Sequence, residues 1–226
     1  MRYPGAKWRP VKNRSTSTSW GGGRMTSHLG LILHVQAGNN SPYGWFNNAA
    51  SGASSTWWVS KTGTVEQYVD TDYRAWAQGS GNATYNSVET EGYPGEPLTA
   101  AQVRALGQLY AWGHAKLGWP ARLAEHPGER GLGWHGMGGA AWGGHVACPG
   151  DKRRAQRADV LAAVRGTPPK PAAKPAARPA VTILPLAKEF DVDEKTLRKI
   201  IREEVLGAKF REFVDENGDG LKPRTV

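Results

Sequence analysis

A chain of 226 residues with 39% hydrophobic residues and ten tryptophans is long enough and apolar enough to bury a substantial core. Its longest apolar run, residues 29–35, is far too short to span a bilayer, and the first residues contain no apolar segment typical of a secretory signal. We therefore expect a globular protein that is made and kept in the cytosol, where its single cysteine stays reduced and forms no internal disulfide.

The net charge of +9 lies almost entirely in the first part of the chain. Residues 1–166 hold 17 Lys and Arg against 10 Asp and Glu, whereas residues 167–226 hold 12 against 10. A basic, aromatic-rich region is compatible with nucleic acid, an anionic membrane or an acidic polymer such as a bacterial cell wall. It is equally compatible with a solvated surface that has no specific partner, so charge alone does not identify the partner.

The first predicted strand follows an arm over residues 1–27 that shows no periodicity and reads as irregular. Residues 29–35 form an apolar run typical of a buried strand, with His34 near its carboxyl end. A polar loop over residues 36–40 follows, and ligands gather at the carboxyl ends of strands in open sheets. Taken alone, such a histidine is more often a satisfied core residue than a ligand. The adjoining loop makes His34 a candidate metal ligand.

The next two runs predict a β-hairpin. Residues 56–60 and 64–69 are rich in β-forming residues, and Lys-Thr-Gly joins them. This fits a tight turn with Gly63 at a positive φ.

A further strand over residues 86–92 carries two carboxylates, Glu89 and Glu91. A solvated strand face is the simplest explanation for both of them. If one points inward instead, it could act as a general base.

Two helices follow. Residues 99–102, Thr-Ala-Ala-Gln, have the form of a capping box, and apolar residues at helical spacing behind it predict a helix over about 100–117. His114 on that helix is expected to be structural, and His126 exposed. After Gly150, Asp151 is expected to cap a helix that ends near residue 166.

The stretch over residues 133–151 holds two of the six histidines and the only cysteine: His135, His145 and Cys148. The glycine-rich sequence between them can bend to bring them together, and zinc favours imidazole with thiolate. The cysteine could also be a small buried hydrophobe or a nucleophile. One of these histidines and the cysteine would supply two ligands, which are too few to hold zinc. His34 is therefore the candidate for the third ligand.

The C-terminal part differs sharply in composition. Residues 167–185 contain six of the fifteen prolines and predict an extended linker. A capping box then leads into a helix expected over about 192–206. Residues 186–226 are few for an independent fold, so their apolar stripe would need self-association or a partner to cover it.

Several of these features occur in the order seen in one family. The chain resembles the type 2 zinc-dependent N-acetylmuramoyl-L-alanine amidases, which are related to peptidoglycan-recognition proteins and common among phage endolysins. The resemblance covers about residues 25–165 and is carried by His34, Gly63-Thr64-Val65, Arg74-Ala75-Trp76, the strand over 87–92, His135 and Cys148-Pro149-Gly150-Asp151.

The resemblance implies an α/β fold, with a central mixed β-sheet flanked by helices and zinc in a cleft. By position it implies that His34, His135 and Cys148 hold the metal and that Glu89 is the catalytic glutamate, with Glu91 as its nearest rival. Some of five tryptophans could also line the cleft: Trp57, Trp58, Trp76, Trp134 and Trp142. For most of them, burial in the core is the more common fate.

The sequence departs from the family pattern around the last ligand. The spacing from His135 to Cys148 is longer than usual, and the position two before the ligand is Val146 rather than Lys, Thr or His. His145 stands one residue further off. It is therefore a candidate to stabilise the oxyanion, or to be a ligand in place of His135.

The implied function is a peptidoglycan hydrolase that cleaves the amide between N-acetylmuramic acid and L-alanine through zinc-activated water, with Glu89 taking the proton. A phage endolysin fits a chain without a signal sequence: it is made in the host cytoplasm and reaches the wall at lysis. Residues 1–166 would be the catalytic domain and residues 186–226 a wall-binding or oligomerisation element.

Two other classes of function compete with this interpretation. One is a zinc-bearing peptidoglycan-binding module without hydrolysis, against which Cys148 and Glu89 argue. The other is a basic nucleic-acid-binding protein, which is weakened because the basic residues are scattered and no recognition-helix pattern appears.

Overall fold

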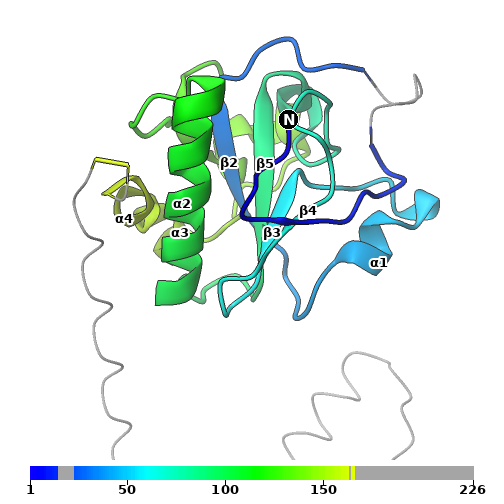
Figure 1. Cartoon of the computed structure of the whole chain (residues 1–226), viewed down its shortest axis with the longest axis horizontal. Coiled ribbons are helices and arrows are strands. Elements are labelled where there is room, and N and C mark those ends of the chain that lie inside the picture. The colour runs from blue at the N-terminus through cyan, green and yellow to red at the C-terminus, as the bar shows by residue number, and fades with distance from the viewer. Residues whose placement is uncertain (15–22, 163, 166–226) are drawn as a thin grey trace, which may run out of the picture. The chain divides into compact units, whose positions relative to one another are not determined.

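The computed structural model describes residues 1–14, 23–162, 164 and 165 (Figure 1). The linker expected over 167–185, the helix expected over 192–206 and the C-terminal element over 186–226 lie outside these described residues. Among the described helices, none is long and apolar enough to cross a membrane.

A six-stranded sheet forms the centre of the described chain, in the order β1-β4-β3-β5-β2-β6. β3 and β4 pair antiparallel, and the other neighbouring pairs are parallel. The sheet is therefore mixed, as expected. The strands are β1 (Lys7–Trp8), β2 (Gly30–Val35), β3 (Trp57–Val59), β4 (Val65–Gln67), β5 (Tyr85–Thr90) and β6 (Gly131–Trp134).

Helices flank this sheet. The long helix α2 (Ala100–Leu117) lies across one face, with the shorter α3 and α4 beside it (Figure 1). The remaining helices are α1 (Tyr43–Phe46), α3 (Asp151–Ala155) and α4 (Arg157–Ala162), together with the 3₁₀ helices η1 (Ala49–Ser51), η2 (Gly79–Ala83) and η3 (His135–Trp142). The expected α/β architecture is confirmed.

Alternate residues of the strands pack on opposite faces of the sheet. Leu31, Leu33 and Val88 belong to the main core under α2, together with Trp57, which is fully buried. Burial at about 25 cal/mol per Å² of apolar surface makes this layer the main source of stability. Because side chains alternate along a strand, the residues between these, including His34, point to the face away from α2.

The predicted hairpin and the predicted long helix are confirmed. Gly63 has a φ of 91° in the turn between β3 and β4. At the start of α2, the Thr99 hydroxyl accepts from Gln102 N at 3.1 Å, and the Gln102 side chain accepts from Thr99 N at 3.0 Å. Gly118 ends the helix with a φ of 70°. His114 Nδ1 donates to the Trp119 carbonyl, and His126 is exposed, as expected.

The N-terminal arm is more ordered than its sequence suggests. Residues 7–8 form β1, and Arg9 N and Val11 N continue the ladder by donating to the carbonyls of Gln67 and Tyr68. The open edge of β4 offers unpaired backbone groups, and these order the arm without any apolar alternation in its own sequence.

The single helix expected after Gly150 is two short helices in the structure. It divides into α3 and α4 at Gln156, whose side chain turns away to bond both backbone groups of Leu98. Asp151 is not the cap: Gly150 occupies that position with no side-chain cap hydrogen bond, and Asp151 lies in the first turn.

Candidate metal centre and catalytic cleft

The site begins where β2 and β5 end side by side. His34 and Glu89 are partners in the parallel register of these strands. Both point to the face away from α2, and His34 Nδ1 lies 3.7 Å from Glu89 Oε1. The His34 side chain is buried, as expected for a residue on a central strand.

His135 reaches the same place from the neighbouring strand. β6, which the glycine-rich sequence did not reveal, pairs with β2 up to Trp134, so the next residue lies beside His34. The two imidazole rings are 4.3 Å apart between centroids. His135 is therefore at a strand end rather than in the loop that we expected.

Cys148 completes the cluster from the following loop. Val35 N lies 3.4 Å from Cys148 Sγ, and Gly136 N donates to the Cys148 carbonyl at 2.9 Å. A Cβ on Gly136 would lie 2.3 Å from the Val146 carbonyl oxygen, so only glycine permits this approach. Potential ligand atoms of His34, His135 and Cys148 all lie within 4.8 Å of one another.

His145 stands at the rim of this cluster. Its side chain is exposed, and its ring centroid is 5.1 Å from that of His135. The structure thus brings His135, and not His145, together with His34 and Cys148. His145 still lines the cleft, where it faces solvent.

The two carboxylates after Val88 have different surroundings. Glu89 lines the cleft, and its Oε2 is buried without a hydrogen bond to any described residue. Glu91 accepts from Asn40 N at 2.8 Å and from Lys61 N at 2.7 Å. Glu91 therefore links two loops, whereas Glu89 lines the cleft.

Sequence reasoning missed two buried polar residues next to the site. Gln78 contacts His34, and Arg153 donates to Thr90 Oγ1 at 2.6 Å and to the carbonyls of Glu96 and Glu91. Arg153 lies on α3, just after the Cys148 loop, and is completely buried. Neither residue has a periodic signal, and Gln78 lies 44 residues from His34 in the sequence, so no local pattern points to it.

Burial sets the charge state of the cluster. It lowers the pKa of His34 well below its usual value, with His135 adding to the effect, and it also lowers the pKa of His135. Burial, together with a smaller contribution from the charge of Glu89, raises the pKa of Cys148 to about 12. Burial likewise raises the pKa of Glu89 to about 8, against the opposing charge of Arg153.

This donor set fits zinc. Two neutral imidazoles offer lone pairs, and the thiol would lose its proton on binding a cation. Two nitrogens and one sulfur match the preferences of zinc and leave one tetrahedral position for a substrate or water, as catalytic sites require.

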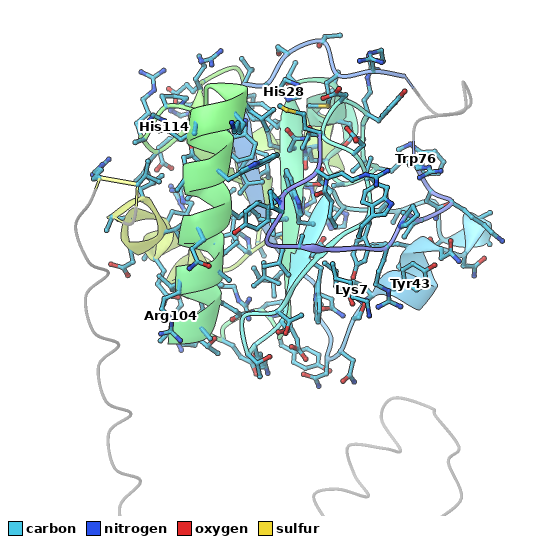
Figure 2. The ribbon with its side chains drawn as sticks, viewed as in Figure 1. Lys7, His28, Tyr43, Trp76, Arg104 and His114 are labelled. Atoms are coloured by element: carbon cyan, nitrogen blue, oxygen red, sulfur yellow. The ribbon has the colours of Figure 1, made fainter. Side chains whose placement is uncertain are left out.

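The cluster lies in a cavity of about 400 Å³ whose other walls include Phe46, Trp76 and Pro94. A second cavity of about 350 Å³ shares Trp76 and His145 and adds Trp142. Figure 2 shows Trp76 across the molecule from Arg104 and His114, which lie on α2. Of the five tryptophans considered, Trp57 and Trp58 are core residues on a central strand, the more common fate that we expected.

Comparison with known proteins agrees with this fold. Three solved structures are similar, each at 16% identity: the Staphylococcus aureus hydrolase AmiA in complex with its ligand, AmpD, and the catalytic domain of XlyA. The matches cover 75%, 71% and 70% of this chain and 90%, 96% and 99% of the respective structures, with TM-scores of 0.56, 0.53 and 0.50. At this identity they show a shared fold. No curated protein sequence matches.

The sequence comparison identifies the family. Residues 25–151 match the model described as N-acetylmuramoyl-L-alanine amidase, a segment that includes every residue of the cluster and more than half of the chain. The chain therefore belongs to the N-acetylmuramoyl-L-alanine amidase family and is a peptidoglycan hydrolase that cleaves the amide between N-acetylmuramic acid and L-alanine.

Proposed function

We propose that this amidase works with one zinc ion held by His34, His135 and Cys148. The observation that supports this most directly is the convergence of two neutral imidazoles and one thiol, from separate parts of the chain, within 4.8 Å. A zinc ion held there supplies Lewis-acid chemistry, because it polarises an amide carbonyl and makes water more acidic.

Glu89 is proposed as the general base. Its side chain lines the cleft, and its Oε2 makes no hydrogen bond to a described residue, so the carboxylate can accept the proton of the attacking water. The water oxygen bonds to the carbonyl carbon, and the carbon–nitrogen bond breaks. Glu89 then passes the proton to the leaving amino group of L-alanine.

His145 is proposed as the group that stabilises the oxyanion. It is exposed on the cleft wall, next to His135 but outside the cluster. From there a ring N–H can donate to the carbonyl oxygen as negative charge develops on it.

Metal analysis tests the ligand set. We expect His34→Ala and Cys148→Ser to lose most of the bound zinc, and His145→Ala to keep it. Full zinc occupancy in both His34→Ala and Cys148→Ser would show that the site is elsewhere. Zinc retained by His135→Ala but lost by His145→Ala would exchange the roles of these two histidines.

The biological setting that we propose is that of a phage endolysin acting on the host wall. A catalytic domain over 1–166, a Pro/Ala/Lys linker over 167–185 and a tail over 186–226 that self-associates or binds a wall polymer fit that role. Zymography on purified peptidoglycan, with mass analysis of the released stem peptides, tests the activity. Truncation after Gly166 should preserve cleavage of soluble muropeptide and lower lysis of whole cells; a truncated protein that does not bind zinc would contradict this division.

A further inference from the structure

Gln78 is a buried side chain that contacts a proposed ligand but is not itself a ligand. It lies immediately before η2 and is 1% exposed. Its Oε1 lies 3.0 Å from His34 Nε2, and its Nε2 donates to the Tyr85 carbonyl at 3.0 Å. The same carboxamide therefore contacts the backbone of β5 and the imidazole on β2.

The chemistry of the carboxamide fixes its orientation. One end only donates and the other only accepts. The Tyr85 carbonyl can only accept, so the amide NH₂ must face it and the amide oxygen must face His34. His34 Nε2 must then carry the ring proton. The lone pair is left on Nδ1, the nitrogen on the side of Glu89.

The backbone around Gln78 is held rigidly. The Asn82 side chain accepts from the backbone N–H groups of both Ala77 and Gln78, at 3.0 and 2.8 Å. Gly79 has a φ of 48°, and a Cβ there would lie 2.7 Å from the Ala141 carbonyl oxygen. This turn presents the amide in one place.

The backbone of His34 is fixed as well, because its carbonyl accepts from Thr90 Oγ1 at 2.5 Å. What remains to be set is the tautomer and the rotation of the ring, and the contact with Gln78 sets both.

The tautomer of His135 is fixed by a different kind of contact. Its Nε2 lies 2.9 Å from the Trp142 carbonyl oxygen, which can only accept. His135 is therefore also protonated at Nε2 and offers Nδ1. Since a backbone carbonyl holds His135, no side-chain substitution tests that contact, whereas Gln78 can be replaced.

We propose that Gln78 is a positioning residue that fixes the Nε2–H tautomer and the ring orientation of His34, so that Nδ1 faces the metal. This inference rests on the proposed zinc site. Loss of such a contact to a ligating histidine typically weakens metal affinity about 10–100-fold.

Three variants test this role. Gln78→Met keeps the length of the side chain and removes the acceptor, whereas Gln78→Glu keeps an oxygen that accepts from His34. Gln67→Met is the matched control, because Gln67 is also 1% exposed and its side chain, among the described residues, bonds to the backbone of Tyr3, Met1 and Val69 rather than to a proposed ligand. The measurements are the zinc dissociation constant by chelator competition and the ring-nitrogen NMR spectrum of the metal-free full chain.

We expect the metal-free wild type to show His34 as the Nε2–H tautomer. Gln78→Met should populate both tautomers and bind zinc about 10–100-fold more weakly. Gln78→Glu should restore the Nε2–H tautomer, because it keeps an acceptor for His34, and Gln67→Met should leave the affinity unchanged.

Three results would overturn the proposal: an Nδ1–H tautomer of His34 in the wild type, wild-type zinc affinity in Gln78→Met, or an equal loss of affinity in Gln67→Met. If Gln78→Met does not fold, the tautomer of the wild type decides. The zinc site fails separately: His34→Ala that still binds zinc would contradict the ligand set, whereas His34→Ala without zinc and Gln78→Met with normal affinity would contradict only the role of Gln78.

Discussion

Two glutamates on the same sheet have opposite surroundings. Glu66, on β4, accepts from Arg9 Nη1 at 2.7 Å, from Ser41 Oγ at 2.5 Å and from the Tyr68 hydroxyl at 2.7 Å. Glu89, on β5, has a buried Oε2 without a hydrogen bond to any residue in the described part of the chain. One carboxylate is saturated with donors and the other is left available.

Their acidities differ accordingly. Burial alone raises the pKa of Glu66, but the hydrogen bonds from Ser41, Tyr68 and Arg9 outweigh it, and the net result is a pKa below the usual value. Burial raises the pKa of Glu89 to about 8, because only the charge of Arg153 opposes it. A buried carboxylate that lacks donors is unfavourable for stability, and such groups concentrate at functional sites. The contrast separates a structural glutamate from the one that we propose as the general base.

The largest expected effect is on catalysis. Glu89→Gln should lower wall-lytic activity by about 10² to 10⁴, because the amide cannot accept the proton, while zinc content and fold are retained. Glu66→Gln serves as the control and should keep near-normal activity per folded molecule. Measured lysis rates that fall equally in both variants would remove the distinction between the two glutamates.

The next largest effect is on stability, and here we expect Glu66→Gln to lose more than Glu89→Gln. Glu66→Gln should lower the free energy of unfolding by about 2 kcal/mol at neutral pH, because hydrogen bonds to a charged acceptor are lost and an amide NH₂ then faces hydroxyl donors. Glu89→Gln should cost little, since Oε2 has no donor among the described residues to lose. Urea unfolding of the metal-free proteins measures both, and a larger loss in Glu89→Gln would contradict the assignment.

The same comparison predicts a pH dependence. The pKa of Glu66 is lowered in the folded protein, so its stabilisation is fully present above the usual pKa of 4.5. It is lost as the pH falls through the lower pKa of the folded state. Melting temperatures between pH 6 and pH 3 should therefore fall more steeply for the wild type than for Glu66→Gln; parallel curves would show that Glu66 is not the cause.

Sequence patterns predicted the parts of the fold that carry strong local signals. An apolar run gave β2, a turn glycine gave the β3–β4 hairpin, and a capping box gave the start of α2. β6 was missed because its four residues, Gly-Leu-Gly-Trp, show neither alternation nor β-branched residues. β1 was missed because its order comes from the free edge of β4 rather than from its own sequence.

The three candidate ligands were named from the sequence, and the structure brings them together, but the residues around them were not predicted. His34, His135 and Cys148 could be named because their chemistry stands out at strand ends and in a short motif. Gln78 and Arg153 could not be predicted, because a buried polar residue is recognised only by its partners. His34, the partner of Gln78, lies 44 residues away in the sequence, and Thr90, a partner of Arg153, lies 63 residues away. Such contacts depend on the tertiary fold.

The smallest effect is expected for Glu91, the rival of Glu89. Its two carboxylate oxygens accept from Asn40 N and Lys61 N, and it does not line the cleft with Glu89. An amide keeps one acceptor oxygen, so Glu91→Gln should retain one of these bonds and lose about 1 kcal/mol of stability. Its activity on soluble muropeptide should stay within about threefold of the wild type, well inside the ~10² loss expected for removal of a general base. Strong loss of turnover in Glu91→Gln with normal turnover in Glu89→Gln would assign the catalytic role to Glu91, the carboxylate with two donors. The contrast between glutamates with and without hydrogen-bond donors would then not predict which one is catalytic.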